Sequence, residues 1–157
     1  MIAKNDKTHL ALSHQIEARQ VKKTYLALVR GVIQEGQGTI HMPIGRSTKD
    51  RKKMAVQKNG KDAITHFKVL KRFQGYTFLE VTIETGRTHQ IRVHLAQIGH
   101  PVVGDTTYSN GKNPFGVTGQ CLHAAQLDFV HPITGVPMHL VAPLPSYFEK
   151  ILKELET

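Results

Sequence analysis

Apolar and polar residues alternate over the segment 77–84, which predicts a β-strand with one buried face. That face comprises Leu79, Val81 and Ile83. The alternation ends at Gly86, and from Thr88 the apolar residues recur at the spacing of a helix instead. The chain is therefore expected to form a strand, a glycine turn and a helix in immediate succession.

The predicted helix begins near Thr88 and ends at Gly99. Its buried stripe comprises Ile91, Leu95 and Ile98. At about 100° per residue, Arg92 lies at the margin of this stripe beside His89, whereas Gln90 points away from it. Two interpretations of Arg92 follow. Its stem covers the edge of the core while its head meets water, or its guanidinium reaches into a cleft.

Further strands are expected on both sides of this unit. They cover residues 22–29, 39–42, 63–70, 122–129 and 137–142. The dipeptide at 59–60 is Asn-Gly, which predicts a hairpin joining 54–57 to 63–70. The first strand carries Tyr25, whose ring belongs either to the core or to a site.

Helices are expected near both ends of the chain. After a strand end at 1–3, residues 5–19 have the cap and the apolar spacing of a helix. Ser146 and Glu149 form a capping box for a last helix. Its buried face comprises Phe148, Ile151, Leu152 and Leu155. No repeat, linker or change of composition divides the 157 residues, so we expect a single domain.

The charge balance narrows the class of partner. Twenty-one Lys and Arg against twelve Asp and Glu give a formal charge of +9, which favours a polyanion through phosphate contacts and counterion release. No apolar run approaches the ~20 residues that span a bilayer, which argues against a membrane. The start of the chain is not a signal peptide, and the single Cys121 forms no internal disulfide. We therefore expect a reducing cytoplasm.

Basic residues concentrate in the segment 45–53, which has no apolar member and predicts a solvated loop. They are Arg46, Lys49, Arg51, Lys52 and Lys53. Such a loop is either a solubilising surface or an arm that contacts phosphates. The second interpretation is favoured on a chain that is already positive.

No metal or cofactor chemistry is indicated. The chain has ten histidines, but His89 and His94 point to different sides of their helix, and no Cys or acidic pair accompanies them at ligand spacing. No phosphate-binding glycine loop occurs, and no serine lies on a nucleophile elbow. We expect neither a bound metal nor a cofactor.

Four segments, in the right order, resemble the RluA-type pseudouridine synthases. The most specific is Gly-Arg-Thr-His-Gln-Ile-Arg-Val-His at 86–94, followed by Gly-His-Pro at 99–101 and Gly-Asp at 104–105. The others are residues 22–31, residues 60–67, and 122–124 with 129–132. The resemblance implies an α+β domain with a mixed, mainly antiparallel sheet and flanking helices, which acts on RNA without metal or cofactor.

In that family a uridine is flipped out of the RNA, its glycosidic bond is cut, and the uracil is rejoined through carbon 5. The resemblance implies that Tyr25 packs against the flipped base, and the matching tyrosine has been considered a proton acceptor. It implies that Arg92 pairs with a catalytic aspartate, which needs a cationic partner to stay ionised. Leu122 matches an apolar position that lines the pocket. Arg87 and His89 of the central motif, with the basic loop, are expected to bind the substrate.

One part of the family pattern is missing. The catalytic aspartate lies in a His-Arg-Leu-Asp segment that would precede Met1, and no aspartate of this chain lies in such a segment. The aspartates are Asp6, Asp50, Asp62, Asp105 and Asp128. We therefore expect residues 1–157 to be the C-terminal part of the catalytic domain, inactive alone and with an open sheet edge. The oligomeric state is left open, with a monomer expected for the complete protein.

The basic loop and the overall pattern favour large-subunit ribosomal RNA as the substrate, with transfer RNA as the alternative. Two other classes remain open: an RNA-binding protein without catalysis, and a structural protein of the ribosome. Arg92 separates the first from an enzyme. Its replacement by alanine should weaken RNA binding only if Arg92 is itself a phosphate contact.

Overall fold

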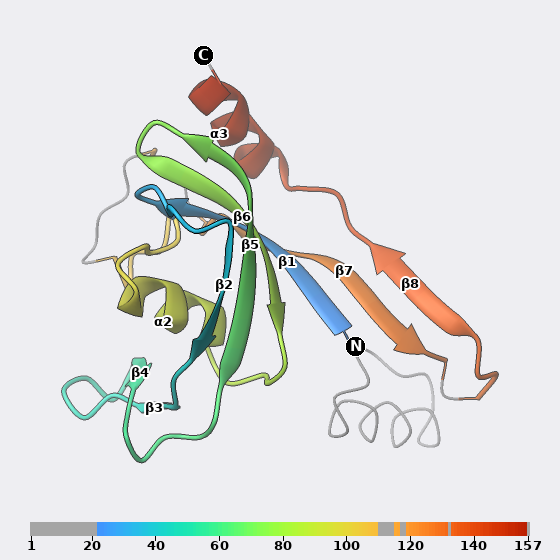
Figure 1. Cartoon of the computed structure of the whole chain (residues 1–157), viewed down its shortest axis with the longest axis horizontal. Helices are drawn as coiled ribbons and strands as arrows, with labels where there is room; N and C mark the ends of the chain where they lie inside the picture. Colours follow the sequence, from blue (N-terminus) through green and yellow to red (C-terminus); the bar gives the residue numbers. More distant parts are fainter. Residues whose placement is uncertain (1–21, 110–114, 117–118, 132, 157) are drawn as a thin grey trace.

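The computed structural model describes residues 22–109, 115–116, 119–131 and 133–156. Its main feature is a six-stranded sheet in the order β2-β5-β6-β1-β7-β8 (Figure 1). The strands are β1 (Lys22–Arg30), β2 (Gln37–His41), β5 (Ile64–Phe73), β6 (Tyr76–Ile83), β7 (Leu122–Val130) and β8 (Pro137–Val141). A separate two-stranded sheet contains β3 (Ile44–Arg46) and β4 (Met54–Val56), and the helices are α2 (Gln90–Gln97) and α3 (Ser146–Glu156). All pairings between these strands are antiparallel, which confirms the predicted α+β class.

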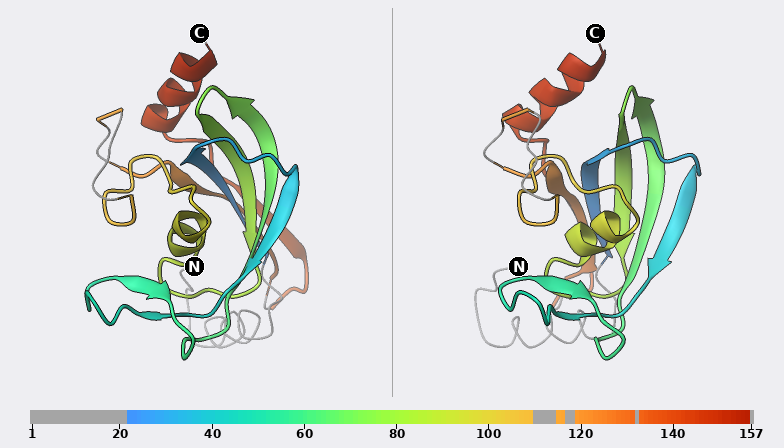
Figure 2. Two further views of the ribbon diagram at one scale, coloured as in Figure 1. Left: turned by 60° about the vertical axis from the view of Figure 1, so that its left-hand side comes forward. Right: turned by 90° about the vertical axis from the view of Figure 1, so that its left-hand side faces the viewer.

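The two helices close two different apolar cores. Alternation along β1 divides its side chains between them, because Ala27 and Val29 join one cluster while Leu28 joins the other. The first cluster includes Leu95 of α2, and the second includes Phe148 of α3. Figures 1 and 2 show α2 lying against the sheet, while α3 lies beside the end of the β5–β6 hairpin. Both described helices are thus attached to the sheet through buried apolar side chains.

The helix predictions are confirmed where the structure describes them. In α2, Ile91 and Leu95 are buried and Ile98 packs against the same cluster. In α3, Phe148 and Ile151 are buried as expected. The strand end at 1–3 and the helix at 5–19 lie outside the described residues. None of the described helices is long and apolar enough to cross a membrane.

The prediction for Gln90 was wrong, because this side chain is only 3% exposed. Its Oε1 accepts hydrogen bonds from Thr85 Oγ1 at 2.6 Å and from the Arg87 amide at 3.1 Å. Its Nε2 donates to the Ile64 carbonyl at 2.9 Å and to Thr65 Oγ1 at 3.0 Å. These four bonds use both donors and both lone pairs of the amide, so the polar group is buried without an unsatisfied atom.

The hairpin predicted around 59–60 was also wrong. Strand β4 pairs with β3, while β5 pairs with β2 and β6. Gly60 lies directly against the backbone of Ile44, where an added Cβ would stand 2.5 Å from the Ile44 carbonyl carbon. Lys61 and Ile44 exchange two backbone hydrogen bonds of 2.9 Å. The Asn-Gly turn therefore directs the chain across the β3–β4 hairpin instead of back along β4.

Candidate active site

Several residues of the central motif line one small cleft of about 150 Å³. It lies where β1, the end of β6, the start of α2 and the start of β7 meet. Its lining comprises Tyr25, Ile83, Arg87, His89, Gln90, Ile91, Arg92 and Leu122. The structure thus brings together five residues that the sequence singled out: Tyr25, Arg87, His89, Arg92 and Leu122.

Tyr25 reaches this cleft from the central strand of the sheet. The pairing of β1 with β7 shifts at this point, since Thr24 pairs with Gln126 but Tyr25 pairs with Ala124. A bulge of this kind changes the direction of a side chain and is common beside active sites. Burial raises the pKa of Tyr25, so its hydroxyl is neutral at neutral pH. The ring therefore offers the cleft an aromatic face rather than a phenolate.

Arg92 is held by a buried ion pair with Asp105. Its Nε donates to Oδ2 at 2.8 Å and its Nη2 donates to Oδ1 at 2.9 Å, the bidentate geometry of a strong pair. The side chain of Asp105 is fully buried, and that of Arg92 is 13% exposed. The backbone amides of Thr107 and Tyr108 also donate to Oδ1, at 3.0 and 3.2 Å. The guanidinium consequently has one fixed orientation at the edge of the cleft.

The ionisation of the pair follows from these contacts. Burial acts to raise the pKa of Asp105, but the hydrogen bonds from Arg92 and from the Tyr108 amide outweigh it, and the pKa is lowered. The hydrogen bond to Asp105 raises the pKa of Arg92 against the opposing effect of burial. Both groups are therefore charged at neutral pH.

The sequence did not identify Asp105 as the partner of Arg92. An aspartate that caps the amides two and three residues later is a common turn pattern, and Gly104 before it fits a turn. That pattern explains the local contacts alone. The approach of Arg92, 13 residues earlier in the chain, depends on how α2 packs on the sheet.

Tyr108 is a second residue that the sequence missed. The Arg92 guanidinium carbon lies 5.0 Å from the centre of its ring, within the range of a cation–π contact. The Tyr108 hydroxyl lies 2.8 Å from His89 Nδ1 and accepts a hydrogen bond from the Met54 amide at 3.1 Å. Tyr108 thus connects the cleft to strand β4.

His89 occupies an unusual position immediately before α2. Its φ of 56° and ψ of 23° are left-handed, and it is the one non-glycine with positive φ among the described residues. Burial and the charge of Arg92 lower its pKa, while Asp105 opposes them. The ring is therefore neutral at neutral pH, and its Nδ1 can accept the proton of the Tyr108 hydroxyl.

The remaining predicted residues lie outside this cleft. Arg46 lines a neighbouring cavity that also contains Arg87, and its Nη1 donates to the Arg51 carbonyl at 3.0 Å. The other basic residues occupy the β3–β4 loop and line neither cavity: Lys49, Arg51, Lys52 and Lys53. Their predicted contact with phosphate remains a prediction.

The buried histidine and cysteine have structural surroundings. His94 is fully buried, with Nδ1 2.8 Å from Thr65 Oγ1 and Nε2 2.9 Å from the Met42 carbonyl. Burial raises the pKa of Cys121 to about 12, which makes its thiol unreactive. Over the parts of the chain with described positions, no group of three His, Cys, Asp or Glu could hold a metal ion.

Comparisons with known proteins identify the family. The model of the family described as RNA pseudouridylate synthase matches residues 1–97. The chain is 47% identical over 155 residues to "Uncharacterized RNA pseudouridine synthase YlyB" of Bacillus subtilis (strain 168), covering 99% of this chain and 51% of that protein. It is 44% identical to "Ribosomal large subunit pseudouridine synthase D" of Pseudomonas aeruginosa, covering 99% of this chain and 52% of that protein.

A solved structure supports the same assignment. "Human RNA Pseudouridylate Synthase Domain Containing 1" superposes with a TM-score of 0.77 at 30% identity, over 99% of this chain and 74% of that one. The fold is that of a pseudouridine synthase domain, and the chain belongs to the RNA pseudouridylate synthase family. It spans about half the length of the curated relatives it matches.

Proposed function

We propose that this chain supplies the base-binding and arginine-bearing part of an enzyme that isomerises uridine to pseudouridine in structured RNA. In this reaction the bond from C1′ to N1 of the uracil breaks and a bond from C1′ to C5 forms. The hydrogen on C5 is released to solvent and N1 takes up a proton, so the composition is unchanged. The observation that carries the proposal is the convergence of Tyr25, Arg92 and Leu122 on one cleft.

The side chains of the cleft can bind a base that has been flipped out of its RNA stack. The ring of Tyr25 and the side chain of Leu122 offer aromatic and apolar contact to a flipped uracil. Arg92 spends two of its five N–H groups on Asp105, which leaves three for another acceptor. Those groups can hold a catalytic carboxylate in its ionised form. Arg87 and His89 also line this cleft, and we propose that they contact the RNA around the base.

We propose that the catalytic carboxylate comes from a segment outside this chain. Among the described residues, the cleft lining contains no aspartate or glutamate. The aspartates among the described residues have other partners: Asp50 accepts from the Lys52 amide, Asp62 contacts His41, Asp105 pairs with Arg92, and Asp128 contacts His139. We therefore propose that residues 1–157 are the C-terminal part of the catalytic domain and expect them to be inactive alone.

Large-subunit ribosomal RNA is the proposed substrate. Relatives at 37–44% identity are described as ribosomal large subunit pseudouridine synthase D. The net charge of +9 and the basic β3–β4 loop suit a partner rich in phosphates. We further propose that the complete protein is a monomer and works in the cytoplasm, where a single buried Cys121 stays reduced.

Tritium release tests the proposal. Large-subunit RNA would be transcribed with uridine labelled at carbon 5 and incubated with this chain, or with this chain fused to the half of the Bacillus subtilis relative that it does not match. We expect no release from the chain alone and release from the fusion. In the fusion, Arg92→Ala should abolish release, whereas Lys150→Ala, on α3 and outside the cleft lining, should not.

Two outcomes would contradict these proposals. Release by the chain alone would show that one of its own carboxylates performs the chemistry. RNA binding without release, from a fusion that is folded, would favour an RNA-binding protein without catalysis. In that case Arg92→Ala should lower both the affinity and its dependence on salt.

A further inference from the structure

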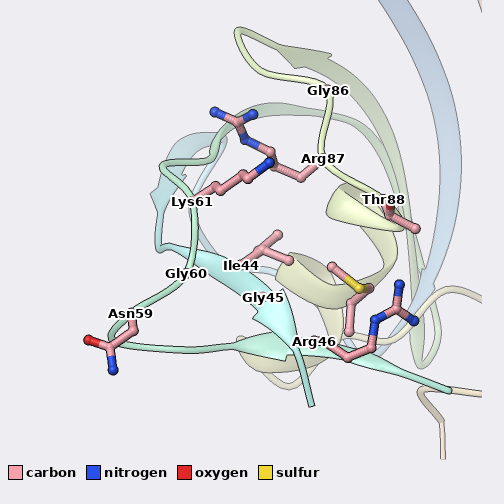
Figure 3. Close-up of a pocket in the computed structure, with 10 residues that line it drawn as sticks. Ile44, Gly45, Arg46, Asn59, Gly60, Lys61, Gly86, Arg87 and Thr88 are labelled. Carbon is pink, nitrogen blue, oxygen red and sulfur yellow. The ribbon is translucent and has the colours of Figure 1, made fainter. Parts of the chain in front are cut away.

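A larger cavity of about 420 Å³ lies beside the cleft, between the β3–β4 hairpin and the loop from β6 to α2. This volume falls within the range of roughly 300–1,000 Å³ that is usual for small-ligand sites. Its lining comprises Ile44, Gly45, Arg46, Met54, Asn59, Gly60, Lys61, Gly86, Arg87 and Thr88 (Figure 3). The cavity is therefore larger than the cleft, whose volume is about 150 Å³, and it can hold a larger ligand.

Three cations from three segments line this cavity. In the view of Figure 3, Lys61 and Arg87 are drawn toward one side of the cavity and Arg46 toward the other. The Arg87 Nε donates to the Asp62 carbonyl at 2.8 Å, and the Arg46 Nη1 donates to the Arg51 carbonyl at 3.0 Å. These bonds orient two guanidinium groups and leave N–H groups for a ligand. The lining contains no acidic residue, so the local charge selects an anion.

The rest of the lining includes small and apolar residues. Gly86 has open space beside its Cα, and partly buried Met54 provides apolar surface. Cations for a phosphate beside apolar surface for a base are the combination that proteins use to hold unpaired nucleotides. An isolated phosphate would need only the cations.

We propose that this cavity binds a second nucleotide of the RNA, adjacent in the strand to the uridine held in the cleft. Its phosphate contacts Lys61 and Arg87, and its base lies against Met54. Arg87 lines both cavities, so the two occupants are neighbours. The inference rests on the proposed function, because it requires that the cleft receives a uridine.

Nuclear magnetic resonance of this chain tests the site directly. The amide signals of Gly45, Gly60 and Gly86 would be followed while the dinucleotide UpU, uridine or inorganic phosphate is added. We expect UpU to shift these three signals together with the signal of Leu122 in the cleft. Uridine should shift the Leu122 signal with little effect on the glycines, since it lacks the phosphate.

Two substitutions sharpen the test. Lys61→Ala should weaken UpU binding on the order of 5-fold through the loss of one phosphate contact. The matched control is Lys58→Ala, which removes the same charge three residues away but outside the cavity lining, and it should change binding less than about twofold. Gly86→Val adds bulk to the cavity wall without changing charge, and a Cβ at Gly86 meets no atom within 4 Å. This substitution should also weaken UpU binding, and circular dichroism should show that the chain remains folded.

Three results would overturn the inference. The first is that the glycine signals do not shift at the highest soluble UpU concentration. The second is that phosphate alone shifts them as strongly as UpU, and the third is that Lys58→Ala lowers the affinity for UpU as much as Lys61→Ala does. None of these depends on tritium release. A synthase whose second cavity is empty of RNA would release tritium while the glycine signals stay still, so failure of this site and failure of the proposed activity are distinguishable.

Discussion

At the scale of single residues, Asp105 determines where the positive charge of Arg92 points. The carboxylate has no exposed surface and receives four hydrogen bonds, two from Arg92 and two from backbone amides. A buried pair of this kind contributes more to specificity of geometry than to net stability, because both charges lose their hydration. Removal of one partner, however, leaves the other charge buried and unpaired.

Replacement of this carboxylate should therefore be costly. We expect Asp105→Asn to lower the free energy of unfolding by about 3–5 kcal/mol, measured by urea denaturation at pH 7. The control is Asp128→Asn, whose carboxylate is 37% exposed and contacts exposed His139, with an expected change below about 1 kcal/mol. Because the folded pKa of Asp105 is lowered, its contribution is complete above its unfolded pKa near 3.9 and disappears as pH falls through the folded value. Equal losses in the two variants would contradict this account.

His94 should make the fold sensitive to mild acid. Burial lowers its pKa, opposed by the bond to the Met42 carbonyl, with the nearby His41 adding repulsion. The unfolded chain then binds more protons below a pH of about 6.5, so stability falls as pH drops from there toward the folded pKa. We expect His94→Asn to be less stable at pH 7.5 but to lose less stability between pH 7 and 5 than the unaltered chain. Parallel pH profiles in thermal denaturation would show that His94 is not the group involved.

Residue type and motif singled out side chains that the structure places at the cleft, whereas contacts that depend on packing were missed. Tyr25, Arg92 and Leu122 were predicted, and the structure places all three at the cleft. Asp105 was missed and the burial of Gln90 was not predicted. Helical spacing predicts only which side of α2 is apolar. Whether a carboxylate or an amide is buried depends on hydrogen-bond partners from other parts of the chain.

At the scale of elements, the β3–β4 hairpin carries a concentration of positive charge. Arg46 is the last residue of β3, next to the loop of the hairpin, and is exposed. Lys49 and Lys52 lie in the loop and are also exposed, and their ammonium groups form none of the ion pairs found among the described residues. A loop of this kind contributes affinity that falls steeply with salt.

Neutralising the loop should reduce that dependence. The double variant Lys49→Gln/Lys52→Gln should bind large-subunit RNA with a weaker dependence on salt. We expect the slope of log affinity against log salt to become shallower by about one to two units. The control pair Lys150→Gln and Lys153→Gln removes the same charge from exposed positions of α3. Filter binding at several salt concentrations measures both. The same change in both pairs would mean that only total charge matters.

The elements themselves were predictable where their pattern is local. Alternation located β1, β5, β6 and β7, and apolar spacing located α2 and α3. The Asn-Gly turn at 59–60 gave a wrong hairpin prediction. Turn propensity indicates that the chain reverses direction, but it does not indicate which strand the chain then pairs with. That choice depends on Gly60 fitting against Ile44, a contact between segments that turn statistics do not include.

At the scale of the whole molecule, the described sheet has two edges, β2 and β8. The β7–β8 end is the more apolar, with Ile133 and Val136 each 53% exposed, Leu140 49% and Val141 63%. An exposed apolar edge strand favours pairing with another chain. The open edge expected from the sequence therefore has a clear candidate in β8, although β2 also ends the described sheet.

A charge on that edge should suppress self-association. We expect Val141→Lys to lower the average mass of the chain in sedimentation equilibrium at high protein concentration, with a change in unfolding free energy within about 0.5 kcal/mol. The control Gln34→Lys adds the same charge at an exposed position between β1 and β2. If both variants lower the mass equally, repulsion between like-charged chains explains the effect and β8 has no special role.

The Tyr108 hydroxyl joins parts of the molecule that have different roles. It accepts the Met54 amide of the hairpin and lies against His89, which lines the cleft. The amide proton of Met54 is thereby shielded from exchange with solvent by a bond whose other partner lines the cleft. A base that enters the cleft and turns the His89 ring will alter the lifetime of that proton, so deuterium uptake at Met54 reports occupancy of a cleft that Met54 does not line.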